Sequence, residues 1–253
     1  MIDIHCHILP EIDDGARDLE TAIRMCHMAE ANGIKHIVAT PHTNTVDNIG
    51  SFIKLRDERL NALREKIAER GINIKLYPGA EVFVDDDIFF ANDLRKLAIN
   101  GSRYILIEFN FRNVRIRKIY DYLNEIIDAG LVPIIAHPER YEFFQFDYDA
   151  VNSLAKNGVI FQLNATSLAS LDGLQEFELA YSMAYNGLAS FIGTDAHSLN
   201  HRATNLSEMM RYFPPDISHY NMQMMLHDAA KAVLTDGPIP IAERREIRKR
   251  GSF

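Results

Sequence analysis

Short apolar segments recur along this chain, and most of them end in a residue type that can bind a metal ion. Seven of these segments have the length of strands, and helix-like segments separate most of them. This alternation predicts parallel βαβ units in an α/β fold. Six of the seven strands end in the following residues: His5 and His7, His42, Glu81, Glu108, His137, and Asp195 with His197. Because strand carboxyl ends meet at one mouth of a parallel α/β barrel, we expect these side chains to gather in one cluster.

The order of the expected elements indicates a single domain. Strands are predicted at residues 1–7, 34–40, 72–77, 104–107, 131–136, 159–163 and 188–193. Helices are predicted at 18–32, 49–70, 116–129, 148–157, 173–186 and 218–234, with a short helical stretch after 85–87 and another that carries Arg202. Asp18 is the expected N-cap of the first helix, and Gly33 its expected stop. No linker divides the chain, so we expect one domain over 1–253, with the motifs in 1–202 and C-terminal helices and a basic tail in 203–253.

Composition limits the classes of protein to which the chain can belong. Its 253 residues carry a net charge of −8, which argues against nucleic acid as a partner. No apolar run approaches the roughly 18 residues that cross a bilayer, and no secretory signal begins the sequence, so we expect a protein that does not span a membrane. The two cysteines, Cys6 and Cys26, are too few for a disulfide framework and favour a cytoplasmic location.

One segment is strongly basic, and it lies near the end of the chain at 244–250. We interpret it as a solvated tail, because charge runs are usually exposed. Contact with an anionic surface or with a partner protein is the alternative.

The first strand places two imidazoles together. Alternate side chains of a strand share a face, so His5 and His7 are expected to point the same way and Cys6 to point away from them. Two imidazoles on one face can bind a single divalent ion. A lone His-x-His spacing is common by chance, and the evidence for a metal site comes from the other strand ends.

The full set of candidate ligands is too large for one ion. It comprises His5, His7, Asp14, His42, Glu81, Glu108, His137, Asp195 and His197. Mixed imidazole and carboxylate ligands suit manganese, iron or zinc better than magnesium or calcium. Nine ligands fit two or three ions, with one carboxylate bridging. With three divalent ions bound, the four carboxylates would leave a net positive site that favours an anion such as a phosphate.

Two arginines follow the later motifs and are expected on loops just outside the mouth. Arg140 lies three residues after His137, and Arg202 lies five after His197. Guanidinium groups bind phosphate oxygens in a bidentate manner, although a surface salt bridge is an equally good interpretation of either arginine alone. Together with the metal ligands they indicate hydrolysis of a phosphate ester by a metal-bound hydroxide.

Several motifs together resemble those of a known superfamily. The segments are Asp3-Ile4-His5-Cys6-His7, Pro41-His42, Pro78-Gly79-Ala80-Glu81, Ala136-His137-Pro138-Glu139-Arg140 and Gly193-Thr194-Asp195-Ala196-His197. They are similar to the successive motifs of the polymerase-and-histidinol-phosphatase (PHP) superfamily. His5-Cys6-His7-Ile8-Leu9-Pro10 followed by Asp13-Asp14-Gly15 resembles its branch of bacterial tyrosine phosphatases from capsule and exopolysaccharide systems.

The resemblance implies a fold and a distribution of ligands. The fold would be a distorted seven-stranded (β/α)7 barrel of the PHP type, holding three divalent ions, with manganese favoured and iron or zinc as alternatives. His5, His7, Glu81 and Asp195 would bind the first ion. Glu81, Glu108 and His137 would bind the second, and Asp14, His42 and His197 the third. Arg140 and Arg202 would be the catalytic and substrate-binding residues that hold the phosphate.

The resemblance also implies a substrate, namely phosphotyrosine on a membrane-bound tyrosine autokinase of polysaccharide export. Tyr141, Phe143 and Phe144 could flank the aromatic ring, but core packing is the preferred interpretation for most of them. A small-molecule phosphatase, such as one for histidinol phosphate, is the alternative enzyme. A non-catalytic barrel that binds a partner is the alternative of another class.

A phosphatase with a cysteine nucleophile is excluded by spacing. Such enzymes need an arginine six residues after the cysteine to close the phosphate loop. Ile12 follows Cys6 at this distance, and Asn32 follows Cys26. The oligomeric state stays open.

Overall fold

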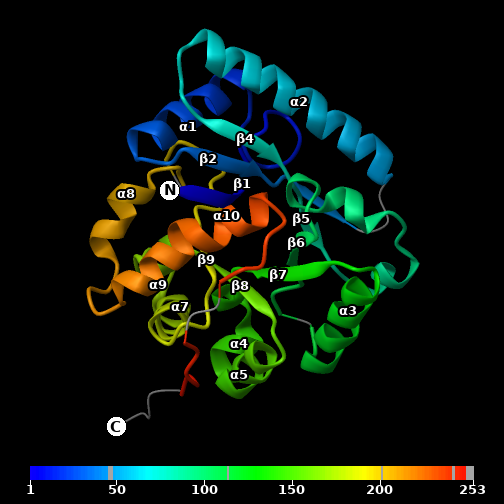
Figure 1. The fold of residues 1–253 in the computed structure, drawn as a ribbon, viewed down its shortest axis with the longest axis vertical. Helices are drawn as coiled ribbons and strands as arrows, with labels where there is room; N and C mark the ends of the chain where they lie inside the picture. Colours follow the sequence, from blue (N-terminus) through cyan, green and yellow to red (C-terminus); the bar gives the residue numbers. More distant parts are fainter. Residues whose placement is uncertain (45–47, 113, 201, 241–242, 249–253) are drawn as a thin grey trace.

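The protein is an α/β structure with two parallel sheets (Figure 1). The computed structural model describes residues 1–44, 48–112, 114–200, 202–240 and 243–248. Within them, one sheet has the order β1 (Ile2–Cys6), β2 (His36–Ala39), β4 (Lys75–Pro78). The other has the order β3 (His42–Asn44), β5 (Glu81–Phe83), β6 (Tyr104–Glu108), β7 (Val132–Ala136), β8 (Ile160–Asn164), β9 (Phe191–Gly193). The predicted α/β class with parallel strands is therefore confirmed.

Two of the seven predicted strands are broken, which is why the described residues contain nine. The second apolar run continues from β2 through Thr40 and Pro41 into β3, and the third continues from β4 through Gly79 and Ala80 into β5. At each break the chain leaves the three-stranded sheet and enters the six-stranded one. The two breaks lie side by side, since the Glu81 N–H donates to the Pro41 carbonyl oxygen at 3.1 Å.

Backbone hydrogen bonds connect the first strand to the last. The Asp195 N–H donates to the His5 carbonyl oxygen at 2.8 Å, and the His7 N–H donates to the Ala196 carbonyl oxygen at 2.9 Å. Asp3 adds a buried side-chain link, accepting hydrogen bonds from the backbone N–H and the hydroxyl of Thr194. These contacts place the end of β1 against the end of β9, so the strands follow one another around a ring.

The inside of this ring is apolar at one end and polar at the other. A buried cluster combines side chains from strands on all sides with one α-helix and a 3-10 turn. Its members are Ile2, Ile4, Val38, Ile99 of the turn Ile99–Gly101, Tyr104, Leu106, Ile134, Ala136, Ile160, Phe191 and, from α10 (Ala229–Leu234), Ala229, Ala230 and Val233. Such a cluster can only lie within the ring. Figure 1 shows α10 lying across the strands, where it closes the amino-terminal end. The carboxyl ends remain for the functional side chains.

Most predicted helices are present. A second, larger cluster of buried apolar side chains packs them against the outside of the ring. The described α-helices are α1 (Leu19–Ala31), α2 (Ile49–Glu69), α3 (Ile116–Asp128), α4 (Glu142–Phe146), α5 (Tyr148–Lys156), α6 (Ala165–Leu168), α7 (Leu174–Tyr185), α8 (Leu206–Met209), α9 (His219–Gln223) and α10. Asp18 caps α1 as predicted, accepting from the Thr21 N–H. A π-helical turn, Met224–Asp228, joins α9 to α10. None of the helices in the described part of the chain is long and apolar enough to cross a membrane.

The predicted helix that carries Arg202 is wrong. Arg202 lies in a bend, with a left-handed φ of +46°, and α8 begins only at Leu206. The backbone N–H of His197 donates to the Arg202 carbonyl oxygen at 2.9 Å. This bond turns the chain back toward the strand ends, which a helix starting at Arg202 would not do.

The basic tail is only partly solvated. Arg245 and Arg248 are exposed, but Ile247 between them is 1 % exposed. The Asn152 side chain on α5 pairs with both the N–H and the carbonyl oxygen of Ile247, at 2.9 and 2.8 Å. The expectation of a solvated tail is therefore wrong at Ile247, and Lys249 and Arg250 lie outside the described residues.

The break between β4 and β5 depends on a glycine. A Cβ added at Gly79 would lie 2.7 Å from the Val38 Cγ1 on the neighbouring strand. We expect Gly79→Ala to lower the free energy of unfolding by about 1–3 kcal/mol, because overpacking displaces a buried neighbour. Urea denaturation followed by circular dichroism measures this change. Gly237→Ala is the control, since its added Cβ meets no atom closer than 3.5 Å, and equal stability of the two variants would contradict the prediction.

Candidate metal centre

All nine predicted ligands lie close together at the carboxyl ends of the strands. Three overlapping groups of potential ligand atoms, each within 4.8 Å of one another, contain eight of them. The ninth, His137, has its Nε2 atom 2.7 Å from Glu81 Oε1. The structure thus brings all nine predicted residues together.

The first group lies deepest and consists of His5, His7, Glu81 and Asp195. The Nε2 atoms of His5 and His7 are 3.2 Å apart. Both lie 3.1 Å from Glu81 Oε2, and they lie 3.4 and 3.5 Å from Asp195 Oδ1. Cys6 points away into the outer core, as the strand pattern predicts. These are the same four residues that the resemblance to the PHP superfamily implied as ligands of the first ion.

The second group differs from the implied set by one histidine. Its members are His42, Glu81 and Glu108. His42 Nδ1 lies 3.2 Å from Glu81 Oε2 and 3.1 Å from Glu108 Oε1. His137, which the resemblance placed here, contacts the other oxygen of Glu81 and is 3.9 Å from Glu108 Oε2. His42 and His137 therefore approach the same two carboxylates from different sides.

The third group faces the solvent. It contains the implied residues Asp14, His42 and His197, together with His7. Asp14 Oδ1 is 3.6 Å from His42 Nε2 and 3.4 Å from His197 Nε2. The Asp14 side chain is 68 % exposed. The cluster therefore opens to the outside on the Asp14 side.

The contacts around Glu81 fit a metal ion better than a hydrogen-bonded core. Three imidazole nitrogens lie within 3.2 Å of the buried Glu81 Oε2, yet this oxygen has no hydrogen-bond partner among the described residues. Buried polar atoms normally have such partners. Imidazole nitrogens that converge on a carboxylate oxygen without hydrogen bonding to it have the arrangement of ligands around a common cation. The mixed donor set suits manganese, iron or zinc.

The electrostatics of the cluster also favour positive charge. Burial lowers the pKa of His5, but Glu81 and Asp195 outweigh this and raise it to about 9. Burial opposes ionisation of Glu81 as well, yet the field of His5 and the hydrogen bond from His137 keep its pKa well below the usual value. The buried carboxylates therefore favour positive charge close to His5, and divalent ions could supply that charge.

Two residues that the sequence analysis missed orient the deepest histidines. His7 Nδ1 lies 2.7 Å from Asp13 Oδ2, and His5 Nδ1 lies 2.7 Å from Gln162 Oε1. Metal-binding histidines usually hold their second ring nitrogen in this way. Asp13 adjoins the predicted ligand Asp14, and Gln162 lies near the end of β8, which corresponds to the one predicted strand (159–163) without a predicted ligand. These two sequence positions were the signals from which the roles of Asp13 and Gln162 could have been predicted.

Both predicted arginines reach the cluster through Asp195. Arg202 Nη1 lies 2.8 Å from Asp195 Oδ2, and Arg140 Nη1 lies 3.4 Å from the same oxygen. Asn164, at the end of β8, donates to it as well at 2.8 Å. The two guanidinium groups therefore converge beside the potential ligands, Arg140 from the 3-10 helix Pro138–Arg140 and Arg202 from a bend.

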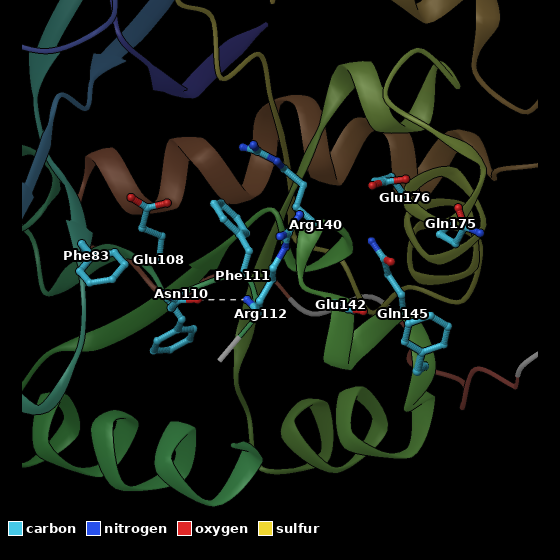
Figure 2. Close-up of a pocket in the computed structure, with 12 residues that line it drawn as sticks. Phe83, Glu108, Asn110, Phe111, Arg112, Arg140, Glu142, Gln145, Gln175 and Glu176 are labelled. Carbon is cyan, nitrogen blue, oxygen red and sulfur yellow. Dashed lines mark hydrogen bonds between the residues drawn. The ribbon is translucent and has the colours of Figure 1, made fainter. Parts of the chain in front are cut away.

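A cavity of about 880 Å³ adjoins the cluster, and both Glu108 of the cluster and Arg140 line it (Figure 2). Arg140 lies with its Cζ atom 4.7 Å from the ring centroid of Phe111, which also lines the cavity. Tyr141 and Phe144 are fully buried, as the preferred interpretation expected. The aromatic residue beside Arg140 is thus Phe111, which the sequence analysis did not single out.

Comparison with known proteins gives a consistent result. Residues 1–235 match the family model described as "Capsular polysaccharide synthesis, CpsB/CapC". The chain is 30% identical to the tyrosine-protein phosphatase YwqE of Bacillus subtilis, over 100% of this chain and 99% of that protein. It is 32% identical to the putative tyrosine-protein phosphatase CapC of Staphylococcus aureus, over 83% of this chain and 82% of that protein.

Solved structures agree with the sequence matches. A structure from a study of YwqE from Bacillus subtilis and CpsB from Streptococcus pneumoniae, described as unique metal-dependent tyrosine phosphatases, superposes with a TM-score of 0.86 at 29% identity. It covers 98% of this chain and 100% of that chain. A phosphotriesterase from Mycobacterium tuberculosis matches with a TM-score of 0.57 at 11% identity, covering 92% of this chain and 93% of that one, which shows similarity of fold alone.

Glu81 is the residue whose loss should most affect metal binding, because its carboxylate contacts members of all three groups. We expect Glu81→Gln to lose at least one bound ion per chain, since the substitution removes a negative charge and a shared oxygen. Elemental analysis after dialysis against manganese measures this number. Glu65→Gln, on the exposed face of α2, should bind as the wild type does. Wild-type stoichiometry and affinity in folded Glu81→Gln would contradict the prediction.

Proposed function

The chain belongs to the CpsB/CapC family of capsular polysaccharide synthesis, and from this membership we propose that it is a metal-dependent protein-tyrosine phosphatase. The observation that carries the proposal is the convergence of Arg140 and Arg202 on Asp195, beside the cluster of potential ligands. Its full-length relative YwqE and its relative CapC are both named as tyrosine-protein phosphatases.

We propose that nine residues hold the metal ions: His5, His7, Asp14, His42, Glu81, Glu108, His137, Asp195 and His197. The three groups support three divalent ions, and the donor types support manganese, with iron or zinc as alternatives. Glu81 would be shared between ions, because each of its oxygens contacts a different set of histidines. Bound divalent ions would supply an acidified water molecule and charge that offsets the phosphate.

The arginines would bind and orient the phosphate. A guanidinium group has five N–H donors, so the contacts of Arg140 and Arg202 with Asp195 leave donors for phosphate oxygens. Their side chains are 33 % and 22 % exposed, which makes them accessible from outside. Asp195 would hold both groups in place before the substrate binds. The arginines would then stabilise the charge that develops on the phosphate oxygens during hydrolysis.

The surroundings of the site favour a protein substrate over a small one. The adjoining cavity of about 880 Å³ is lined by Arg140 at the site and by Phe146 at the exposed surface. The space beside Arg140 supports a substrate in which phosphotyrosine is part of a polypeptide. We propose that this substrate is a tyrosine autokinase of capsule or exopolysaccharide synthesis. A reducing location such as the cytoplasm is consistent with the free thiols of Cys6 and Cys26.

The finer description of the fold is also a proposal. We count β2 with β3 and β4 with β5 as single interrupted strands, because each pair is continuous along the chain. The hydrogen bonds between β1 and the segment after β9 support closure. On this count the structure is a distorted seven-stranded barrel of the PHP type.

The first experiment compares substrates of the two enzyme classes. Metal-stripped protein, reloaded with manganese, should hydrolyse a phosphotyrosine peptide with a higher kcat/KM than histidinol phosphate. EDTA should abolish the activity and manganese should restore it, because the ions supply the nucleophile and the charge. A higher kcat/KM for histidinol phosphate would contradict the assignment of phosphotyrosine as substrate and favour a small-molecule phosphatase. Full activity after verified removal of metal would refute the mechanism.

Arg140 gives a second prediction. Arg140→Ala should keep its bound metal but lower kcat/KM for the phosphotyrosine peptide by about 10²- to 10³-fold, the usual effect of removing a donor that stabilises developing charge. Steady-state kinetics with parallel metal analysis measures both quantities. Arg211→Ala, at an exposed position in the turn Met210–Tyr212, is the matched control. If both variants retain wild-type kinetics, Arg140 has no role in binding phosphate.

A further inference from the structure

Phe111 lies where the phosphate-binding region meets the adjoining cavity. Its ring centroid is 4.7 Å from the guanidinium carbon of Arg140 and 5.6 Å from the ring of His137. The same ring lines the cavity, together with Glu108 of the metal cluster. Figure 2 shows the Phe111 ring between Glu108 on one side and Arg140 on the other. A phosphate bound to Arg140 would therefore place its ester group close to Phe111.

The position of Phe111 is held from behind by a buried tyrosine. Tyr141 is fully buried and stacks on Phe111, with ring centroids 5.3 Å apart. The Tyr141 hydroxyl accepts a hydrogen bond from the Phe109 backbone N–H at 3.1 Å, which fixes the segment that leads to Phe111. A ring with a buried support on one side and a cavity on the other forms a wall. It loses little conformational entropy when a ligand binds.

We propose that Phe111 makes the site selective for aromatic phosphate esters, by holding the Arg140 guanidinium through a cation–π contact and packing against the ring of the ester. The inference rests on the proposed function and names the substrate feature that this site recognises. Aromatic pairs in offset or edge-to-face contact contribute about 0.5–1.5 kcal/mol beyond the area that they bury. An aliphatic ester, such as that of phosphoserine, gains no such contact. The cation–π contact, in contrast, would serve both kinds of ester equally.

A binding experiment separates these two contributions without requiring turnover. Phenylphosphonate and methylphosphonate are non-hydrolysable ligands that share the phosphonate group and differ in the aromatic ring. Calorimetry on the manganese-loaded protein should show that phenylphosphonate binds about three- to tenfold more tightly. In Phe111→Leu the preference should disappear, while both ligands weaken because Arg140 loses its support. Phe111→Tyr should restore the preference.

Phe143 provides a matched control. It stacks on Tyr141 at 5.4 Å, as Phe111 does, and is likewise partly buried, but it is not among the described residues that line the cavity. Phe143→Leu should therefore retain the wild-type preference for phenylphosphonate. A general loosening of the aromatic cluster would instead reduce the preference equally in both leucine variants.

The outcomes distinguish the inference from the proposed function. Loss of aromatic preference in Phe111→Leu alone would support the role of Phe111. Retained preference in Phe111→Leu, equal loss in both variants, or no preference in the wild type would each overturn it. The proposed function has its own test, since turnover of a phosphotyrosine peptide is measured separately from the binding of either phosphonate. If the wild type binds phenylphosphonate selectively but hydrolyses no ester, the proposed phosphatase function is refuted and the inference of an aromatic subsite at Phe111 stands.

Discussion

The arrangement of this site depends on one buried carboxylate, that of Glu81. Isolated negative charge in a protein interior is costly and must be balanced by nearby positive charge. Here imidazoles from several strands surround the carboxylate within hydrogen-bonding distance, yet its Oε2 atom has no hydrogen bond within the described residues. The balance is therefore electrostatic, and protons or metal ions can provide it. In both cases the buried negative charge of Glu81 is balanced only if the strand ends converge around it.

The fold produces this convergence through two local irregularities. The register of β1 against β2 shifts between Asp3 and Cys6, where the inner side chains change from the apolar Ile2 and Ile4 to His5 and His7. Gly79 permits the second irregularity, because a side chain there would collide with the neighbouring strand. The resulting break lets Glu81 pair with His42 in a different sheet from the preceding residues. Both features lie immediately before ligand candidates, so the departures from regular strands serve the site.

Much of this arrangement could be predicted because strand period and strand end are local properties. The spacing of His5 and His7 gave their common direction, and Asp18 gave the start of α1. The loop positions could not be predicted in the same way. Arg202 was expected in a helix, but its backbone is left-handed and its place depends on a hydrogen bond to His197. Gln162 was missed because an amide that supports a histidine has no sequence pattern of its own.

The backbone at the mouth suggests that position matters more there than local stability. His137, Asp195 and Arg202 have φ angles of +32°, +48° and +46°, a region that costs non-glycine residues energy. Each of these residues contributes a side chain to the cluster or to Asp195. A strained residue persists only where the surrounding contacts determine its conformation. Asp195 shows how this is achieved: its N–H donates to the His5 carbonyl oxygen, and its carboxylate accepts from the side chains of Asn164 and Arg202. The residue that joins the last strand to the first through its backbone therefore also positions the arginines through its carboxylate.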